Sequence, residues 1–289
     1  MSNYKIITDS SCDFTKAQYA KLDLTFAPLY LNYKGESIPS FTEPKDLHKF
    51  YDSLREGEMP TTSAVNPDQW AAAIEPALKE GKDALVLGFS SGLSTTYQSA
   101  VIAAEDLKEK YPDRKIIVID TLCAALGQGL LAWYACQKRD EGLSLEELAA
   151  WVENHKLNLC HEVTVNDLNH LKRGGRVSAT TALVGTMLNI KPMIHVDNDG
   201  KLATIAKKRG RKGAMEQIVK RFGELSGNRD NETVFIGHGD CPEDAETLAA
   251  MVKAKCPQVK NVEIGYVGGV IGAHTGPGVL VLFFMGDHR

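Results

Sequence analysis

The sequence is 289 residues long, with 43% hydrophobic and 24% charged residues, which is typical of a folded globular protein and excludes a disordered or fibrous chain. This length favours two domains over one. The formal net charge of -4 disfavours nucleic-acid binding, because surfaces that neutralise phosphates need an excess of lysine and arginine.

The start of the chain and its cysteines predict a cytoplasmic protein. Met1 leads almost directly into a strand-like segment, without the basic and apolar zones of a secretory signal. The longest apolar stretch, residues 279–285, is far shorter than the roughly 20 residues that cross a bilayer. The six cysteines include no Cys-x-x-Cys pair, so we expect reduced thiols rather than disulfides or a zinc site.

The first half of the chain alternates predicted strands and helices. The predicted strands are residues 5–8, 25–31, 84–88 and 115–120. Apolar residues at helical spacing predict helices at 47–54, 68–79, 95–110, 125–140 and 145–155. Asn66 before Pro67 is a typical helix start, and Ser144 with Glu147 forms a capping-box pattern. This alternation predicts a parallel sheet.

Strands dominate the second half. They are predicted at residues 159–165, 190–196, 202–207, 233–237, 261–267 and 279–285. The Asp-Asn-Asp-Gly run at 197–200 has the composition of a hairpin turn, which favours a mixed or antiparallel sheet. We therefore expect an α/β protein in which residues 1–155 form an N-terminal α/β domain with a parallel sheet. Residues 156–289 would form a C-terminal mixed α/β domain, packed against the first so that a crevice remains.

Hydroxyl-rich turns follow the predicted parallel strands. Ser10 and Ser11 come after the first strand, and Ser90 and Ser91 follow the strand at 84–88. Ligands of open parallel sheets bind outside the carboxyl ends of the strands, and hydroxyls with turn amides bind anions without a positive side chain. With His274, which stands among glycines, these turns predict a pocket that holds an acidic head group through uncharged donors.

Each of these features also has a purely structural interpretation. Ser94 precedes the helix predicted to begin near Thr95, so it could bind an anion or simply cap the helix. His274 could equally serve in packing. Most of the other histidines are interpreted as surface or packing residues: His48, His155, His161, His170, His195, His238 and His288.

Two basic stretches leave alternatives open. Residues 168–178 include Arg173 and Arg176 beside two glycines, and could either bind a phosphate or form a solvated turn. Residues 207–212 are interpreted as a solvated connection, with a docking surface for an acidic partner as the alternative.

A serine hydrolase is the main rival hypothesis. Gly-Phe-Ser-Ser-Gly at 88–92 fits G-x-S-x-G, and Ser90, Asp240 and His274 follow the expected chain order. However, the helix is predicted to begin only near Ser94, whereas a nucleophile elbow turns directly from strand into helix. The sequence has no Walker A or G-x-G-x-x-G motif, and residues 238–241 lack a wider ligand set, so we expect no cofactor and no metal.

Five motifs in order resemble the DegV family of bacterial fatty-acid-binding proteins over nearly the whole chain. They are TDSSCD at 8–13, TTSAVNP at 61–67, SSGLSTTYQSA at 90–100, LKRGGRVS at 171–178 and IGAHTGPG at 271–278. The resemblance implies a two-domain carrier, not an enzyme, that sequesters a long-chain fatty acid in phospholipid metabolism. A separate fatty acid kinase would convert the presented carboxylate into an acyl phosphate.

The resemblance also implies roles for particular residues. The carboxylate contacts would be Thr62, with Thr61 or Ser63, then Ser94, the amide of Thr95, and His274. Arg173 and Arg176 would lie in a basic loop near the phosphoryl group or the kinase. The family usually has glycine where this chain has Thr95, so a Cβ there is expected to restrict the turn.

Overall fold

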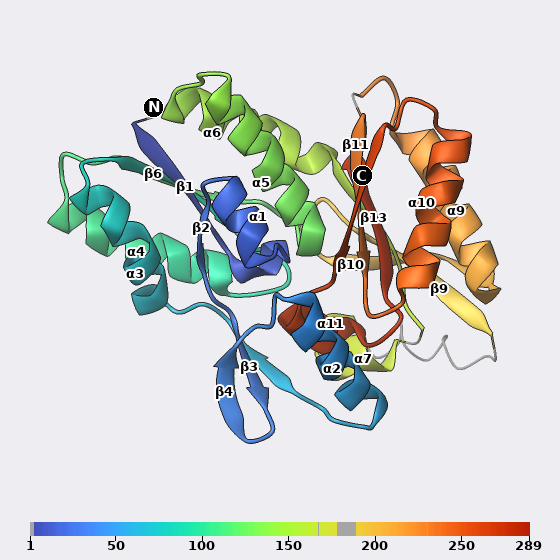
Figure 1. The fold of residues 1–289 in the computed structure, drawn as a ribbon. Coiled ribbons are helices and arrows are strands. Elements are labelled where there is room, and N and C mark those ends of the chain that lie inside the picture. The colour runs from blue at the N-terminus through green and yellow to red at the C-terminus, as the bar shows by residue number, and fades with distance from the viewer. Residues whose placement is uncertain (1–2, 167, 178–188, 230) are drawn as a thin grey trace.

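The computed structural model describes residues 3–166, 168–177, 189–229 and 231–289. Its first half contains a four-stranded, wholly parallel sheet in the order β2-β1-β6-β7 (Figure 1). The strands are β1 (Tyr4–Asp9), β2 (Thr25–Ala27), β6 (Asp83–Gly88) and β7 (Ile116–Asp120). The predicted parallel sheet is confirmed.

Helices flank this sheet, and all but the first match the predicted bounds to within about a residue at each end. They are α1 (Lys16–Lys21), α3 (Pro67–Lys79), α4 (Thr96–Lys110), α5 (Ala125–Asp140) and α6 (Leu145–His155), and the short 3-10 turns are η1 (Ser10–Cys12) and η2 (Lys156–Asn158). Helix α3 begins with Asn66 as the N-cap and Pro67 at the first position, and Ser144 and Glu147 form the predicted capping box.

The single strand predicted at residues 25–31 is wrong. Strand β2 ends at Ala27, and β3 (Tyr30–Tyr33) belongs to a separate antiparallel sheet with β4 (Glu36–Pro39) and β5 (Thr61–Ser63). Pro28 lies at the break, where it has no N–H to donate to a sheet ladder. Between β4 and β5 lies α2 (Pro44–Arg55), which is longer than the predicted helix.

The second half contains a six-stranded mixed sheet in the order β10-β9-β8-β13-β11-β12. Its strands are β8 (Leu159–Thr164), β9 (Ile190–Val196), β10 (Leu202–Arg209), β11 (Thr233–His238), β12 (Asn261–Tyr266) and β13 (Leu280–Met285). Only the β11–β12 pair is parallel among its described pairings. The amide of Gly200 donates to the oxygen of Asp197 in the turn between β9 and β10, so the predicted hairpin is confirmed.

Helix α5 lies between the two large sheets (Figure 1). Its first eight residues are all buried, including Leu130 and Leu131. One hydrophobic cluster joins Phe14 from the first half to Phe235 and Phe283 of the six-stranded sheet. The two halves therefore share a core.

The described residues of the second half also form the helices α7 (Asn169–Arg173), α9 (Gly210–Leu225), α10 (Pro242–Lys255) and α11 (Gly269–Thr275). Helix α11 packs against α7 and α2 (Figure 1). Across the described ranges, no helix combines the length and the apolar character needed to cross a membrane.

Candidate functional site

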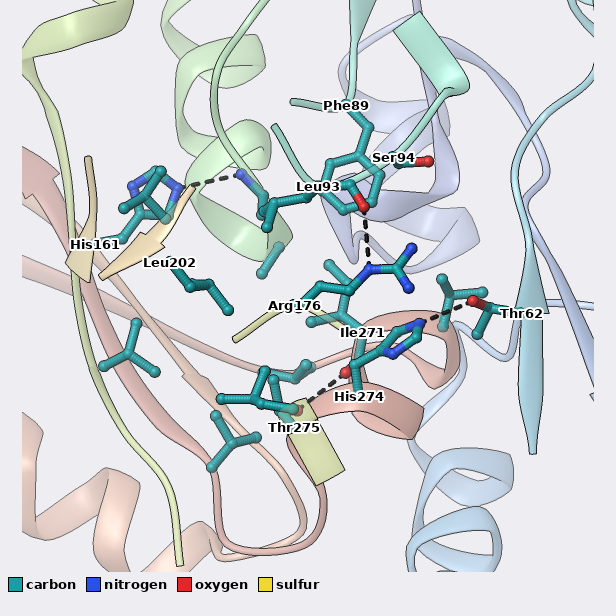
Figure 2. Close-up of a pocket in the computed structure, with 18 of the residues that line it drawn as sticks. Thr62, Phe89, Leu93, Ser94, His161, Arg176, Leu202, Ile271, His274 and Thr275 are labelled. Atoms are coloured by element: carbon teal, nitrogen blue, oxygen red, sulfur yellow. Dashed lines mark hydrogen bonds between the residues drawn. The ribbon is translucent and has the colours of Figure 1, made fainter. Parts of the chain in front are cut away.

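A cavity of about 410 Å³ lies between the carboxyl ends of β6 and β7 and one face of the six-stranded sheet (Figure 2). The loop after β6 contributes Phe89, Ser91, Leu93, Ser94 and Thr95, and the loop after β7 contributes Ala124. The apolar wall from the six-stranded sheet and its hairpin comprises Val163, Ile194, Val196, Leu202, Val281 and Phe283. The predicted crevice thus exists, at the predicted ends of the strands.

Polar side chains gather on one side of this cavity. Thr62, Ser94, Arg176 and His274 line it together, and Figure 2 shows Thr62 and His274 facing each other. Ser63 also lines the cavity, whereas Thr61 does not. The hydroxyl of Thr61 instead accepts a hydrogen bond from Asn32 Nδ2 at 3.1 Å, on the exposed part of the small sheet.

His274 is carried by α11 and is held by two neighbours. Its Nε2 lies 2.8 Å from Thr62 Oγ1. Gly174 packs so closely that a Cβ there would overlap His274 Nδ1. Burial, and secondly the charge of Arg176, lower the His274 pKa from 6.5 to about 4. The imidazole is therefore neutral near pH 7 and can either donate or accept a hydrogen bond.

Arg176 adds a positive charge to the cavity lining, where the sequence predicted uncharged donors. Its Nε donates to the oxygen of Leu93 at 3.1 Å, and its Nη1 donates to the oxygen of Gly174. Burial lowers its pKa, but an arginine stays charged in proteins. The basic loop was expected to lie near a phosphoryl group or a partner enzyme, and its Arg176 lines the cavity. Arg173 does not line the cavity and is bonded at Nη2 to His170 Nδ1 at 2.8 Å.

The start of α4 differs by one residue from the capping interpretation. Thr95, not Ser94, is the N-cap, and it makes no side-chain capping bond. The Ser94 hydroxyl accepts from the Thr96 amide at 3.2 Å and lies 2.8 Å from Thr96 Oγ1. The Thr95 φ of −78° is open to any residue, so the expected restriction of the turn does not arise.

The turn after β1 is brought into the core, not into the cavity lining. The buried Asp9 carboxylate accepts hydrogen bonds from the amide of Ser11 at 2.9 Å and the amide of Phe89 at 2.8 Å. Gln128 Nε2 also donates to it, at 3.2 Å. The hydroxyls of Ser10 and Ser11 are likewise used internally, by the Leu29 amide and by Gln128. This turn fixes the position of Phe89, which does line the cavity.

The hydrolase constellation is not assembled. Ser90 is fully buried and its hydroxyl donates to the oxygen of Gly200 at 2.8 Å. His274 is paired with Thr62, as described above. The third member, Asp240, lies 2.5 Å from Arg55 Nη1 and 2.8 Å from His48 Nδ1.

Among the residues that the structure describes, one cluster has the composition of a metal site: His48, Asp52 and Asp240. Arg55 Nη1 contacts both carboxylates, at 2.7 Å for Asp52 and 2.5 Å for Asp240. A guanidinium already occupies the position between them. The cluster is therefore an ion-pair network that links α2 to the loop after β11.

His161 was missed as a cavity residue. The sequence interpretation grouped it with surface or packing histidines, but it lines the cavity from β8 and is 2% exposed. All six residues of β8 are buried, so the strand lacks the alternation that would separate a cavity-facing residue from a core residue. The sequence held no signal for this role.

Comparison with known proteins identifies the family. The family model "Uncharacterised protein, DegV family COG1307" matches residues 3–287. This chain belongs to the DegV family. The DegV domain-containing protein CPE0026 of Clostridium perfringens is 46% identical, over 100% of this chain and 99% of that protein. A DegV domain-containing protein of Lactococcus lactis, YteA, is 33% identical over 97% of this chain and 96% of its own length.

Solved structures share the whole DegV fold. A structure concerning fatty acid binding of a DegV family protein from Thermus thermophilus has a TM-score of 0.88 and 31% identity, covering 98% of this chain and 99% of that one. DegV from Bacillus subtilis, a fatty acid binding protein, has a TM-score of 0.83 and 28% identity, covering 99% and 100%. The sequence-based resemblance is confirmed.

Proposed function

We propose that this protein binds a long-chain fatty acid, with the acyl tail inside the cavity and the carboxylate at the end formed by Thr62, Ser94, Arg176 and His274. The observation that carries the proposal is the division of one cavity into a polar side and an apolar wall. The fatty-acid binding of the DegV relatives from Thermus thermophilus and Bacillus subtilis supports it.

The tail supplies most of the affinity in this proposal. Burial of a methylene is worth about 0.8 kcal/mol, so about 15 methylenes contribute roughly 12 kcal/mol before the costs of association. A carboxylate buried without partners would cancel much of that gain. The polar side of the cavity therefore has to replace the hydration of the carboxylate.

The described side chains suit that task. Thr62 and Ser94 offer hydroxyl donors, and the neutral His274 offers an N–H when its proton lies on the nitrogen that faces the ligand. Arg176 adds one fixed positive charge, and its Nε and Nη1 donate to the backbone of Leu93 and Gly174. This arrangement holds the guanidinium in the cavity lining, and no carboxylate of the described residues forms a salt bridge with it.

A further part of the proposal is that the protein presents the carboxylate to a separate fatty acid kinase, and does no chemistry itself. This part rests on the family resemblance and on the absence of an assembled Ser90–His274 pair. Loaded protein with ATP alone should form no acyl phosphate, measured by trapping with hydroxylamine. Addition of a purified fatty acid kinase should produce the hydroxamate, and a product formed without the kinase would overturn the carrier role.

Native mass spectrometry of purified, delipidated protein tests fatty-acid binding itself. Added palmitate or oleate should yield a 1:1 complex. Failure to take up any fatty acid would overturn the proposal. A fluorophosphonate probe should leave Ser90 unlabelled, because its hydroxyl is buried and bonded to Gly200. Labelling there would revive the hydrolase hypothesis.

A further inference from the structure

Two histidines line the cavity within the described part of the chain, and they lie on opposite sides of it. His274 stands with Thr62 on the polar side, and Figure 2 shows His161 on the other side of the cavity. The neighbours of His161 in the lining include Val163 from its own strand and Phe283 from β13. His161 is thus placed where the far end of an extended ligand would lie.

The His161 ring is fixed by backbone contacts on both nitrogens. The amide of Ala124 donates to Nε2 at 3.2 Å, so Nε2 carries no proton. Nδ1 then bears the proton and donates to the oxygen of Leu159 at 3.3 Å. The ring also meets Phe283 edge-on, with centroids 5.3 Å apart and an interplanar angle of 83°. Rotation of the ring would break both hydrogen bonds.

The ring has no space behind it. Gly127, in the first turn of α5, packs against it so closely that a Cβ there would overlap His161 Nε2. The same Cβ would lie 2.8 Å from Phe283 Cδ1. The imidazole therefore cannot retreat toward α5 when a ligand presses against it. Burial lowers its pKa to about 3, so the wall that it forms is uncharged near neutral pH.

We propose that His161 determines the length of the acyl tail, because its fixed ring is the wall against which the distal methyl group stops. This inference rests on the proposed function. Its chemical basis is that a rigid, uncharged ring excludes further methylenes, and each excluded methylene loses its burial energy. The alternative is that His161 only anchors Ala124 to β8 through their hydrogen bond. In that case the size of the side chain at position 161 would not affect the preferred length of the fatty acid.

The test is a binding profile over saturated fatty acids of increasing length, from lauric acid to behenic acid, measured by displacement of a fluorescent fatty acid. His161→Ala should move the optimum to longer chains by two or more carbons. Gly127→Ala should move it to shorter chains, because the new Cβ drives the ring into the cavity. Opposite shifts from two neighbouring positions would not follow from a general loss of stability.

Two more variants complete the design. His161→Phe keeps a ring but cannot accept from the Ala124 amide, and it should keep the wild-type optimum. His195→Ala is the matched control, since His195 lies opposite Glu162 in the backbone register of β8 and β9 and does not line the cavity. Its profile should not move. If His161→Ala does not fold by circular dichroism, Gly127→Ala and His161→Phe still test the proposal.

The outcomes separate this proposal from the function on which it rests. No binding of any fatty acid by the wild-type protein would refute fatty-acid binding. A wild-type protein with a clear optimum that His161→Ala and Gly127→Ala leave unchanged would refute only the role of His161. If His161→Phe shifts the optimal chain length as much as His161→Ala does, the hydrogen bond from the Ala124 amide, and not the ring, controls the chain length. That result would also overturn the proposal.

Discussion

Thr62 Oγ1 and His274 Nε2 lie 2.8 Å apart although 212 residues separate them in the chain. Thr62 comes from the small antiparallel sheet of the first half, and His274 from α11 of the second. The polar side of the cavity is therefore formed only when the two halves have come together.

Removal of the Thr62 hydroxyl should weaken fatty-acid binding. Thr62→Val keeps the shape of the side chain, and a hydrogen bond to a charged group is worth about 1.5–3 kcal/mol, so we expect at least about a tenfold higher Kd by titration calorimetry. Thr61→Val is the matched control, because Thr61 faces Asn32 and not the cavity. Equal losses in both variants would contradict the proposed head-group site.

Arg176 should distinguish a charged ligand from a neutral one. Arg176→Met should raise the Kd of palmitate and leave that of palmityl alcohol nearly unchanged, because only the carboxylate interacts with the guanidinium charge. Arg173→Met is the control, since Arg173 lies outside the cavity lining. The measurement is competition against one fluorescent probe, and a parallel loss for acid and alcohol would mean that Arg176 acts only through packing.

The contrast between Arg173 and Arg176 shows where sequence analysis reached its limit. Both occur in one basic, glycine-containing loop, and nothing in their spacing says which one turns inward. That choice depends on the Leu93 oxygen, which is contributed by a loop 83 residues away. The presence of a parallel sheet in the first half, in contrast, followed from local patterns, because continuous apolar runs and helical spacing are properties of short segments.

Two misinterpretations have different causes. The break between β2 and β3 was visible as Pro28, whose missing N–H opposes a continuous strand. The place of His161 was not visible, since a wholly buried strand looks the same whether its neighbour is another side chain or a cavity. Local chemistry thus accounts for the elements, whereas the site depends on contacts between distant segments.

Protonation of His161 should destabilise the fold in acid. Its pKa falls from 6.5 to about 3 on folding, so its contribution is full above pH 6.5 and is lost progressively as the pH falls toward 3. Glu162 acts oppositely, because its pKa is raised to about 7 and its contribution is lost as the pH rises. The free energy of unfolding should therefore be compared between wild type and His161→Phe, which share Glu162.

Urea unfolding at pH 7.5, 6.5 and 5.5 gives that comparison. His161→Phe should be less stable at pH 7.5 by about 1–3 kcal/mol, because the buried Ala124 amide loses its acceptor. The difference in free energy of unfolding between the two proteins should narrow as the pH falls, because only the wild type takes up a proton at this position on unfolding. A difference that stays constant or widens would show that His161 does not titrate as its burial implies.

Asp240 should stabilise the contact between α2 and the second half. Asp240→Asn removes the charge that pairs with Arg55 and His48 and preserves a residue type that tolerates the φ of 56°. Because both partners are largely exposed, we expect a loss of only about 1 kcal/mol, decreasing in high salt. Asp52→Asn is the control at the exposed end of the same network. Equal losses in both variants, or no salt dependence, would contradict this account.

Helix α5 has a consequence for how the polypeptide can be divided. Helix α5 packs in one hydrophobic core with the parallel sheet, and it also contacts β8, β11 and β13 of the six-stranded sheet. Removal of either half of the chain would therefore expose part of the hydrophobic core of the other half. Calorimetry should accordingly record one heat-absorption peak for the intact chain. Fragments cut near residue 156 and expressed apart should be insoluble, and their co-expression should restore a single melting species.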